Sequence, residues 1–140
     1  MTDIESKQGK IKANEEQVFE FLADLRNLDN YIPQDKVQDW QSQEDSCSFS
    51  VPKVGQLSLH IAEKTPFNLI KVEPIGGATP FSFKFFIQIK QVAEQDTRIK
   101  LTLRAELNVM MKTMFKGPLK KGLDQIIDTL SGFTLPTKEE

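Results

Sequence analysis

The spacing of hydrophobic residues changes in a definite order along the chain, beginning with a strand and two short helices. Residues 3–12 carry little apolar content and predict a strand with a bend or bulge at Gly9. Apolar residues then recur at helical spacing up to residue 23, behind a capping box formed by Asn14 and Gln17. A second short helix is expected from about Leu25 to Tyr31.

Between residues 36 and 109 the period changes towards two, which is typical of strands that have one apolar and one polar face. The clearest alternation runs through Phe81, Phe83, Phe85, Ile87 and Ile89, and then through Ile99, Leu101, Leu103, Ala105, Leu107 and Val109. Both strands are long for a small domain. Long strands must twist and bend, so we expect a strongly curved sheet.

One long amphipathic helix is expected to close the chain, starting near Met111. Its apolar positions are mostly three or four residues apart: Met111, Met114, Phe115, Leu119, Leu123, Ile126, Ile127 and Leu130. Gly117–Pro118 interrupts this helix early and predicts a kink or a helix start. The order of elements predicts an α+β fold in which an antiparallel sheet of about six to seven strands wraps around the terminal helix, with two short helices after the first strand.

The composition is that of one globular domain. The chain has 140 residues and a net charge of −2 with both signs interspersed, which argues against nucleic acid as a partner. We expect one domain over residues 1–134 and a frayed tail over 135–140. A lone cysteine, no visible signal peptide and no membrane span together predict a cytoplasmic protein.

Candidate chemistry is sparse in this sequence. The single histidine, His60, falls on the strand parity opposite Leu57 and Leu59, so it is expected to point away from the core. Cys47 shares the apolar parity of its strand and is expected to be a buried structural thiol. One histidine and one cysteine are not a metal site. We therefore expect no catalytic residue, no metal and no cofactor.

The phenylalanine and methionine content is the remaining signal, and it leaves two interpretations open. The apolar stripe either packs into a filled core or lines a cavity for a small ligand. In the second case the lining comes from the sheet and from the last helix, with these candidates: Phe49, Leu57, Leu59, Phe83, Phe85, Leu101, Leu103, Met111, Met114, Phe115 and Leu119.

The segment Gly-Lys-Ile-Lys-Ala-Asn-Glu-Glu-Gln-Val-Phe-Glu-Phe-Leu-Ala-Asp-Leu-Arg-Asn-Leu (9–28), followed by Tyr31-Ile32-Pro33, resembles the start of the SRPBCC superfamily. This START-like, or birch-pollen-allergen-like, group includes polyketide cyclases. Asp24 and Asn27 match its Asp-x-x-Asn turn, and the order of elements agrees along nearly the whole chain. The small size is similar to that of the small bacterial branch.

The resemblance implies a helix-grip fold with a deep cavity between the curved sheet and the last helix. Members of the superfamily bind lipids, sterols, hormones or polyketides there, and some catalyse cyclisation or hydrolysis. No His, Asp or Arg falls on the predicted inward parity of this chain, so no catalytic residue is carried over.

Three functions follow as hypotheses. The first is non-enzymatic binding of a small apolar or amphipathic molecule, lipid-like or polyketide-like, entering near Gly76–Gly77 and Gly117–Pro118. The second is a cyclase or hydratase type of enzyme in the same cavity, which requires an inward-facing polar side chain such as Tyr31, Trp40, His60 or Glu106. The third is a protein-interaction domain, as in a homodimer, that acts without a ligand.

Overall fold

The computed structural model describes residues 2–29, 31–32, 35, 37–52, 55–75 and 82–131. The first half contains β1 (Thr2–Glu5), β2 (Gly9–Ile11), helix α1 (Glu15–Leu22), the 3-10 helix η1 (Leu25–Leu28), β3 (Gln38–Ser42) and β4 (Ser46–Val51). The second half contains β5 (Gly55–Thr65), β6 (Leu69–Pro74), β7 (Phe83–Ala93), β8 (Asp96–Ala105) and helix α2 (Val109–Ser131). The expected tail, 135–140, lies outside the described residues.

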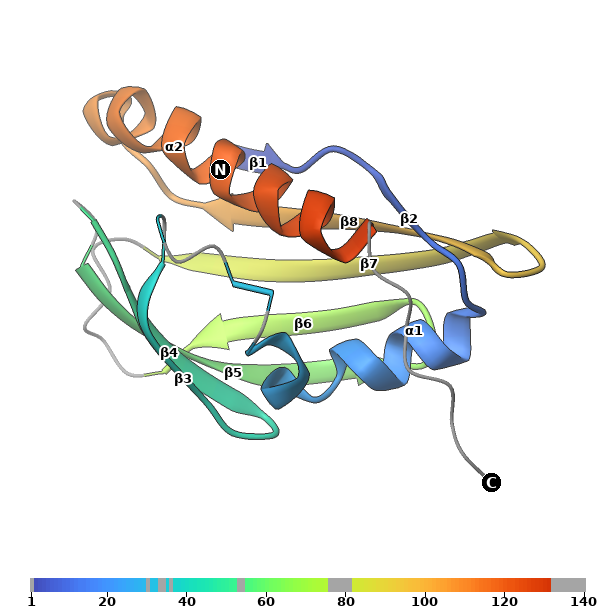
Figure 1. The fold of residues 1–140 in the computed structure, drawn as a ribbon. Coiled ribbons are helices and arrows are strands. Elements are labelled where there is room, and N and C mark those ends of the chain that lie inside the picture. The colour runs from blue at the N-terminus through green and yellow to red at the C-terminus, as the bar shows by residue number, and fades with distance from the viewer. Residues whose placement is uncertain are drawn as a thin grey trace.

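The strands form one antiparallel sheet in the order β1-β8-β7-β6-β5-β4-β3, and β2 pairs with β8 as well. The sheet curves strongly, with α2 along its β1–β8 side and α1 near its other half (Figure 1). β7 and β8 have 11 and 10 residues, and strands of this length must bend to stay in a small domain. The predicted α+β helix-grip architecture is confirmed.

The first predicted strand is interrupted, which is why the described sheet has eight strands rather than six or seven. Residues 6–8 leave the ladder between β1 and β2. At the break, the Ser6 backbone N–H donates to the Leu101 carbonyl at 2.8 Å, and the Ser6 hydroxyl accepts from the Leu101 N–H at 2.8 Å. The backbone N–H and C=O of Leu101 in β8 are therefore satisfied where the neighbouring strand is broken.

Both short helices are present and begin on side-chain caps. The Asn14 side chain accepts from the Gln17 N–H at 2.8 Å, and Gln17 Oε1 accepts from the Asn14 N–H at 3.1 Å, which completes the predicted capping box. Asp24 caps η1 by accepting from the Arg26 N–H at 3.0 Å. This second helix ends at Leu28, earlier than expected.

Helix α2 differs from the sequence expectation at its start. The apolar alternation to Val109 predicted a longer last strand, but β8 ends at Ala105 and the helix begins at Val109. Asn108 accepts from the Met111 N–H at 2.8 Å and so caps the helix. The helix continues through Pro118, so a helix start at that proline is wrong. Among the described residues, no helix has both the length and the apolar character needed to cross a membrane.

The C-terminal half of α2 packs closely on the edge of the sheet formed by β1, β2 and β8. Leu123, Ile127 and Leu130 are buried there. Polar contacts surround this packing: Asp124 accepts from the Lys7 backbone N–H at 2.7 Å, and Lys120 Nζ donates to the Glu5 carbonyl at 3.1 Å. Burial acts to raise the pKa of Asp124, but the bonds from Lys7 and Lys120 lower it below its ordinary value.

The contact between β2 and α2 depends on the absence of a side chain at Gly9. A Cβ atom at this position would lie 2.6 Å from Ser131 Oγ, 2.8 Å from Ile127 Cγ2 and 3.3 Å from Ile99 Cγ1. We expect Gly9→Ala to lower the free energy of unfolding by about 1–3 kcal/mol, because the helix must move away from the strand. Urea denaturation measures this change.

Gly122→Ala is the matched control, because a Cβ atom at Gly122 meets nothing within 4 Å. An alanine in this helix should leave the stability unchanged or raise it by up to about 1 kcal/mol. Equal stability of the Gly9→Ala variant and the native chain would show that α2 is not held at this distance from β2.

Candidate ligand cavity

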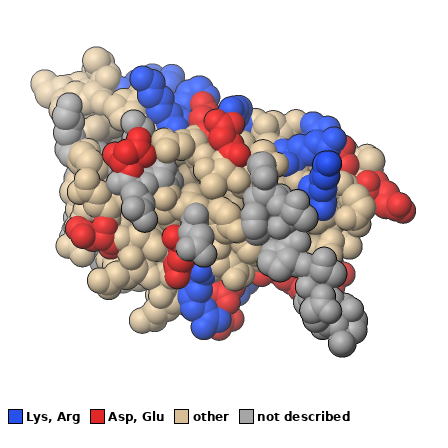
Figure 2. Space-filling view, viewed as in Figure 1, with Lys and Arg blue, Asp and Glu red and all other residues tan. Residues whose placement is uncertain are grey.

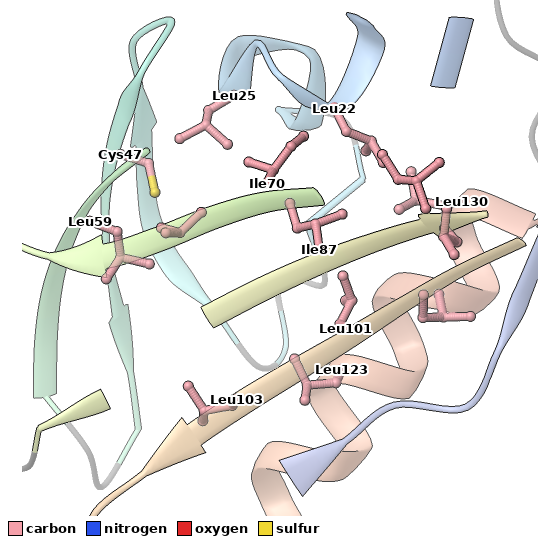
Figure 3. Packing of buried hydrophobic residues seen from close by; sticks show 14 of the residues in the cluster. Leu22, Leu25, Cys47, Leu59, Ile70, Ile87, Leu101, Leu103, Leu123 and Leu130 are labelled. Atoms are coloured by element: carbon pink, nitrogen blue, oxygen red, sulfur yellow. The ribbon is translucent and has the colours of Figure 1, made fainter. Parts of the chain in front are cut away.

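An apolar cavity of about 190 Å³ lies between the concave face of the sheet and the helices. The sheet contributes inward-facing side chains of β3 to β8, namely Trp40, Cys47, Phe49, Val51, Leu57, Leu59, Val72, Phe83, Phe85, Ile87, Ile99, Leu101 and Leu103. They share one face because alternate residues of a strand point to the same side. Figure 3 shows Leu59 and Cys47 on one side of the interior, with Leu101 and Leu103 on another.

Residues of the helices, together with two residues after η1, line the other side of the cavity. From α1 onward these residues are Leu22, Leu25, Leu28, Ile32 and Val37, and from α2 they are Pro118, Leu119, Gly122, Leu123, Ile126 and Leu130. The α2 residues follow helical spacing, so one face of that helix forms the wall. Leu123 projects from α2 toward the strand that carries Leu101 (Figure 3).

The structure brings eight of the eleven predicted site residues together in this lining. They are Phe49, Leu57, Leu59, Phe83, Phe85, Leu101, Leu103 and Leu119. Met111, Met114 and Phe115 lie outside it. Phe115 is buried in the core, Met111 is half-buried against the core, and Met114 is 51% exposed. The first turns of α2 thus lie beyond the cavity.

The lining residues that were not among the eleven predicted site residues come from every part of the site: five from α1, η1 and the chain that follows, six more from the sheet and five more from α2. Leu22, Leu25 and Leu28 continue one apolar helical stripe, and this spacing was a usable signal. Ile32 and Val37 had no such signal, because they lie in irregular chain outside any periodic element. Of the two predicted openings, Gly117–Pro118 adjoins the lining at Pro118, whereas Gly76–Gly77 lies outside the described residues.

Polar chemistry is scarce within the described lining. Burial raises the pKa of the Cys47 thiol to about 12, so this side chain is protonated at neutral pH. The Trp40 indole N–H is engaged in a hydrogen bond to Asp29 Oδ1 at 2.7 Å. Tyr31, His60 and Glu106, the other candidates for a polar cavity group, are not part of the lining.

The described residues hold no group of three or more His, Cys, Asp and Glu side chains that could bind a metal ion. Charges on the outside are mixed: in Figure 2, Lys and Arg side chains lie among Asp and Glu side chains. Ion pairs link several of them across strands, including Arg104 to Asp3 at 3.0 Å and Lys100 to Glu5 at 2.9 Å.

Sequence comparisons give no relatives for this chain: no protein-family model matches it, and no curated protein matches it. Solved structures do match its fold. A START superfamily protein from Mycobacterium smegmatis superimposes with a TM-score of 0.71 and 13% identity, covering 93% of this chain and 94% of that one. A protein from Chromobacterium violaceum gives a TM-score of 0.69 and 12% identity, covering 98% and 100%.

Norcoclaurine synthase from Thalictrum flavum, solved in complex with dopamine and hydroxybenzaldehyde, has the same fold. Its TM-score is 0.69 at 12% identity, covering 94% of this chain and 84% of that one. Identities this low establish shared architecture only. The chain therefore has the START-like helix-grip fold that its sequence resemblance implied.

The position of Cys47 leads to a test of how well this part of the cavity wall is buried. Its pKa is raised from an ordinary 9.0 to about 12, so alkylation by N-ethylmaleimide near neutral pH should be far slower in the folded protein than in urea. Equally fast labelling of folded and unfolded protein would contradict a buried thiol.

The raised pKa of Cys47 also predicts a pH dependence of stability. Because the thiol of the unfolded chain ionises at a lower pH, the free energy of unfolding should fall as pH rises from 9.0 to about 12.

Proposed function

We propose that this protein binds a small apolar or amphipathic molecule, lipid-like or polyketide-like, in the cavity between the sheet and α2. The observation that carries this proposal is a space of about 190 Å³ whose described walls are almost entirely hydrocarbon. Moving an apolar ligand into such a space removes its surface from water, which contributes about 25 cal/mol per Å² before the costs of association.

The volume favours a compact ligand. Pockets for drug-sized molecules usually measure roughly 300–1,000 Å³, and this cavity is smaller. A single aromatic ring or a short alkyl chain is of the right order. The fold neighbour from Thalictrum flavum, in complex with dopamine and hydroxybenzaldehyde, supports the view that this architecture accommodates small aromatic molecules.

Binding is favoured here over a cyclase or hydratase reaction because such chemistry needs a proton donor or acceptor beside the substrate. Among the described lining residues the one titratable group is Cys47, and its raised pKa keeps it neutral. Trp40 faces the cavity, but an indole does not exchange protons near neutral pH.

The homodimer stays a prediction. Val109, Met110 and Met114 are exposed at the start of α2, with Val109 83% exposed, and they form a small apolar surface outside the cavity. Self-association through this surface would not compete with a ligand in the cavity.

A substitution that fills the cavity tests the proposal without opening the core. Leu119→Trp adds an indole to a half-buried lining position on α2, where empty space is available. We expect this variant to bind straight-chain carboxylic acids at least about tenfold more weakly than the native protein, a loss of about 1.4 kcal/mol. Isothermal titration measures the affinities, and native mass spectrometry of the purified protein detects any ligand already bound.

Met114→Trp is the matched control, since it makes the same change on the same helix at an exposed position outside the lining. Its affinity should equal that of the native protein. Equal binding by both variants would place the ligand elsewhere, and a native protein that binds no acid of the series would refute this ligand class.

A further inference from the structure

A second pocket adjoins the apolar cavity and has the opposite chemistry. It is lined by Asp29, Ile32, Val37, Gln38, Asp39, Trp40, Gln41 and Ser42, most of which carry polar side chains. Three of these residues, Ile32, Val37 and Trp40, also line the apolar cavity. They therefore lie where the two spaces adjoin.

Trp40 is the largest of these three shared residues, and its contacts with Asp29 and Phe49 hold it in place. Its indole N–H donates to Asp29 Oδ1 at 2.7 Å, and Ser42 Oγ donates to the same oxygen at 2.5 Å. On the cavity side, its ring lies 5.7 Å from the ring of Phe49. The Asp29 carboxylate thus orients the indole on one side, while aromatic packing orients it on the other.

The backbone of β3 explains how Trp40 comes to face inward. Gln38 pairs with Ser50 and Gln41 pairs with Ser48, so two residues of β3 face one of β4. Such a bulge redirects side chains, and Asp39 within it has a positive φ of 57°. Sequence parity alone does not predict the direction of Trp40, because the bulge shifts the parity within the strand.

We infer that Trp40 is the end wall of the cavity and sets the greatest length of ligand that the protein accepts. This inference rests on the proposed function. Removing the indole joins the apolar cavity to the polar pocket, so that a longer amphipathic molecule fits with its apolar chain inside and its polar end beside Gln38, Gln41 and Ser42. Asp29 acts as a positioning residue, because it touches Trp40 and not the cavity.

A series of straight-chain carboxylic acids of increasing length measures this limit. In the native protein, affinity should rise about fourfold with each added CH₂ until the chain reaches the wall, and then stop rising. Trp40→Ala should move this limit to longer chains. For chains shorter than the limit, the gain in affinity with each added CH₂ should be unchanged. Gln41→Ala, on the same strand but lining only the polar pocket, should keep the native limit.

Asp29→Ala should raise the limiting chain length by less than Trp40→Ala does, because the indole loses its hydrogen bond but not its contact with Phe49. Far-ultraviolet circular dichroism confirms that each variant is folded. A Trp40→Ala variant that binds every chain length more weakly by the same factor, or that keeps the native limit, would overturn the inference.

A second measurement tests, without any ligand, whether Trp40 closes this end of the cavity. Cys47 lines the apolar cavity and pairs with Ser42 across β3 and β4, so it reports access from the polar pocket. Trp40→Ala should raise the rate of Cys47 alkylation by N-ethylmaleimide at least about tenfold, as expected when a buried thiol becomes accessible. Gln41→Ala should not change it.

The two measurements separate the two proposals. If Cys47 is alkylated faster in Trp40→Ala but the native protein binds no acid, the role of Trp40 as the end wall is supported and the proposed ligand class is refuted. A native protein that binds acids, with neither the limit nor the alkylation rate changed in Trp40→Ala, would support the ligand and refute the wall.

Discussion

The close approach of α2 to the β2 edge of the sheet is the constraint on which the interior depends. Gly9 allows Ile127 and Ser131 to approach the strand backbone, and Ile127 and Leu130 are buried. With its C-terminal half held there, α2 cannot also cover the concave face formed by the far strands (Figure 1). Curvature of the long strands increases the distance that side chains would have to span. The cavity is a geometric result of these two facts.

Electrostatics contributes little to this arrangement. The ion pair of Lys100 with Glu5 and that of Arg104 with Asp3 join partners that are at least about a third exposed, and such surface pairs contribute about 0–1 kcal/mol. Asp124 differs, since it bonds the Lys7 backbone N–H and so connects the β1–β2 break to α2. These contacts orient the helix, while burial of its apolar face supplies most of the stabilisation.

Local signals in the sequence were sufficient for the elements and their order. The capping box at Asn14 and the alternation from Phe83 to Ile89 each depend on residues near in sequence, and both are present in the structure. The ends of elements were harder to predict from the sequence. The apolar alternation continues to Val109, but β8 ends at Ala105. Met114 was predicted to line the cavity, but it is exposed. Helical spacing identifies an apolar face and does not show how far along the helix the sheet reaches. The inward direction of the Trp40 side chain depends on a β-bulge, and the periodicity of the sequence does not reveal a bulge.

An empty apolar cavity is costly for a domain of this size. At about 24 cal/mol per Å³ of enclosed void, a volume of 190 Å³ sets an upper limit of about 5 kcal/mol on this cost. Small domains have a total stability of about 5–15 kcal/mol, so a cost near that limit is a considerable part of it. Larger side chains at Val51, Val72 or Gly122 would fill the space with no change in the fold. A ligand in the cavity would instead recover the lost contacts and stabilise the folded state in proportion to its concentration.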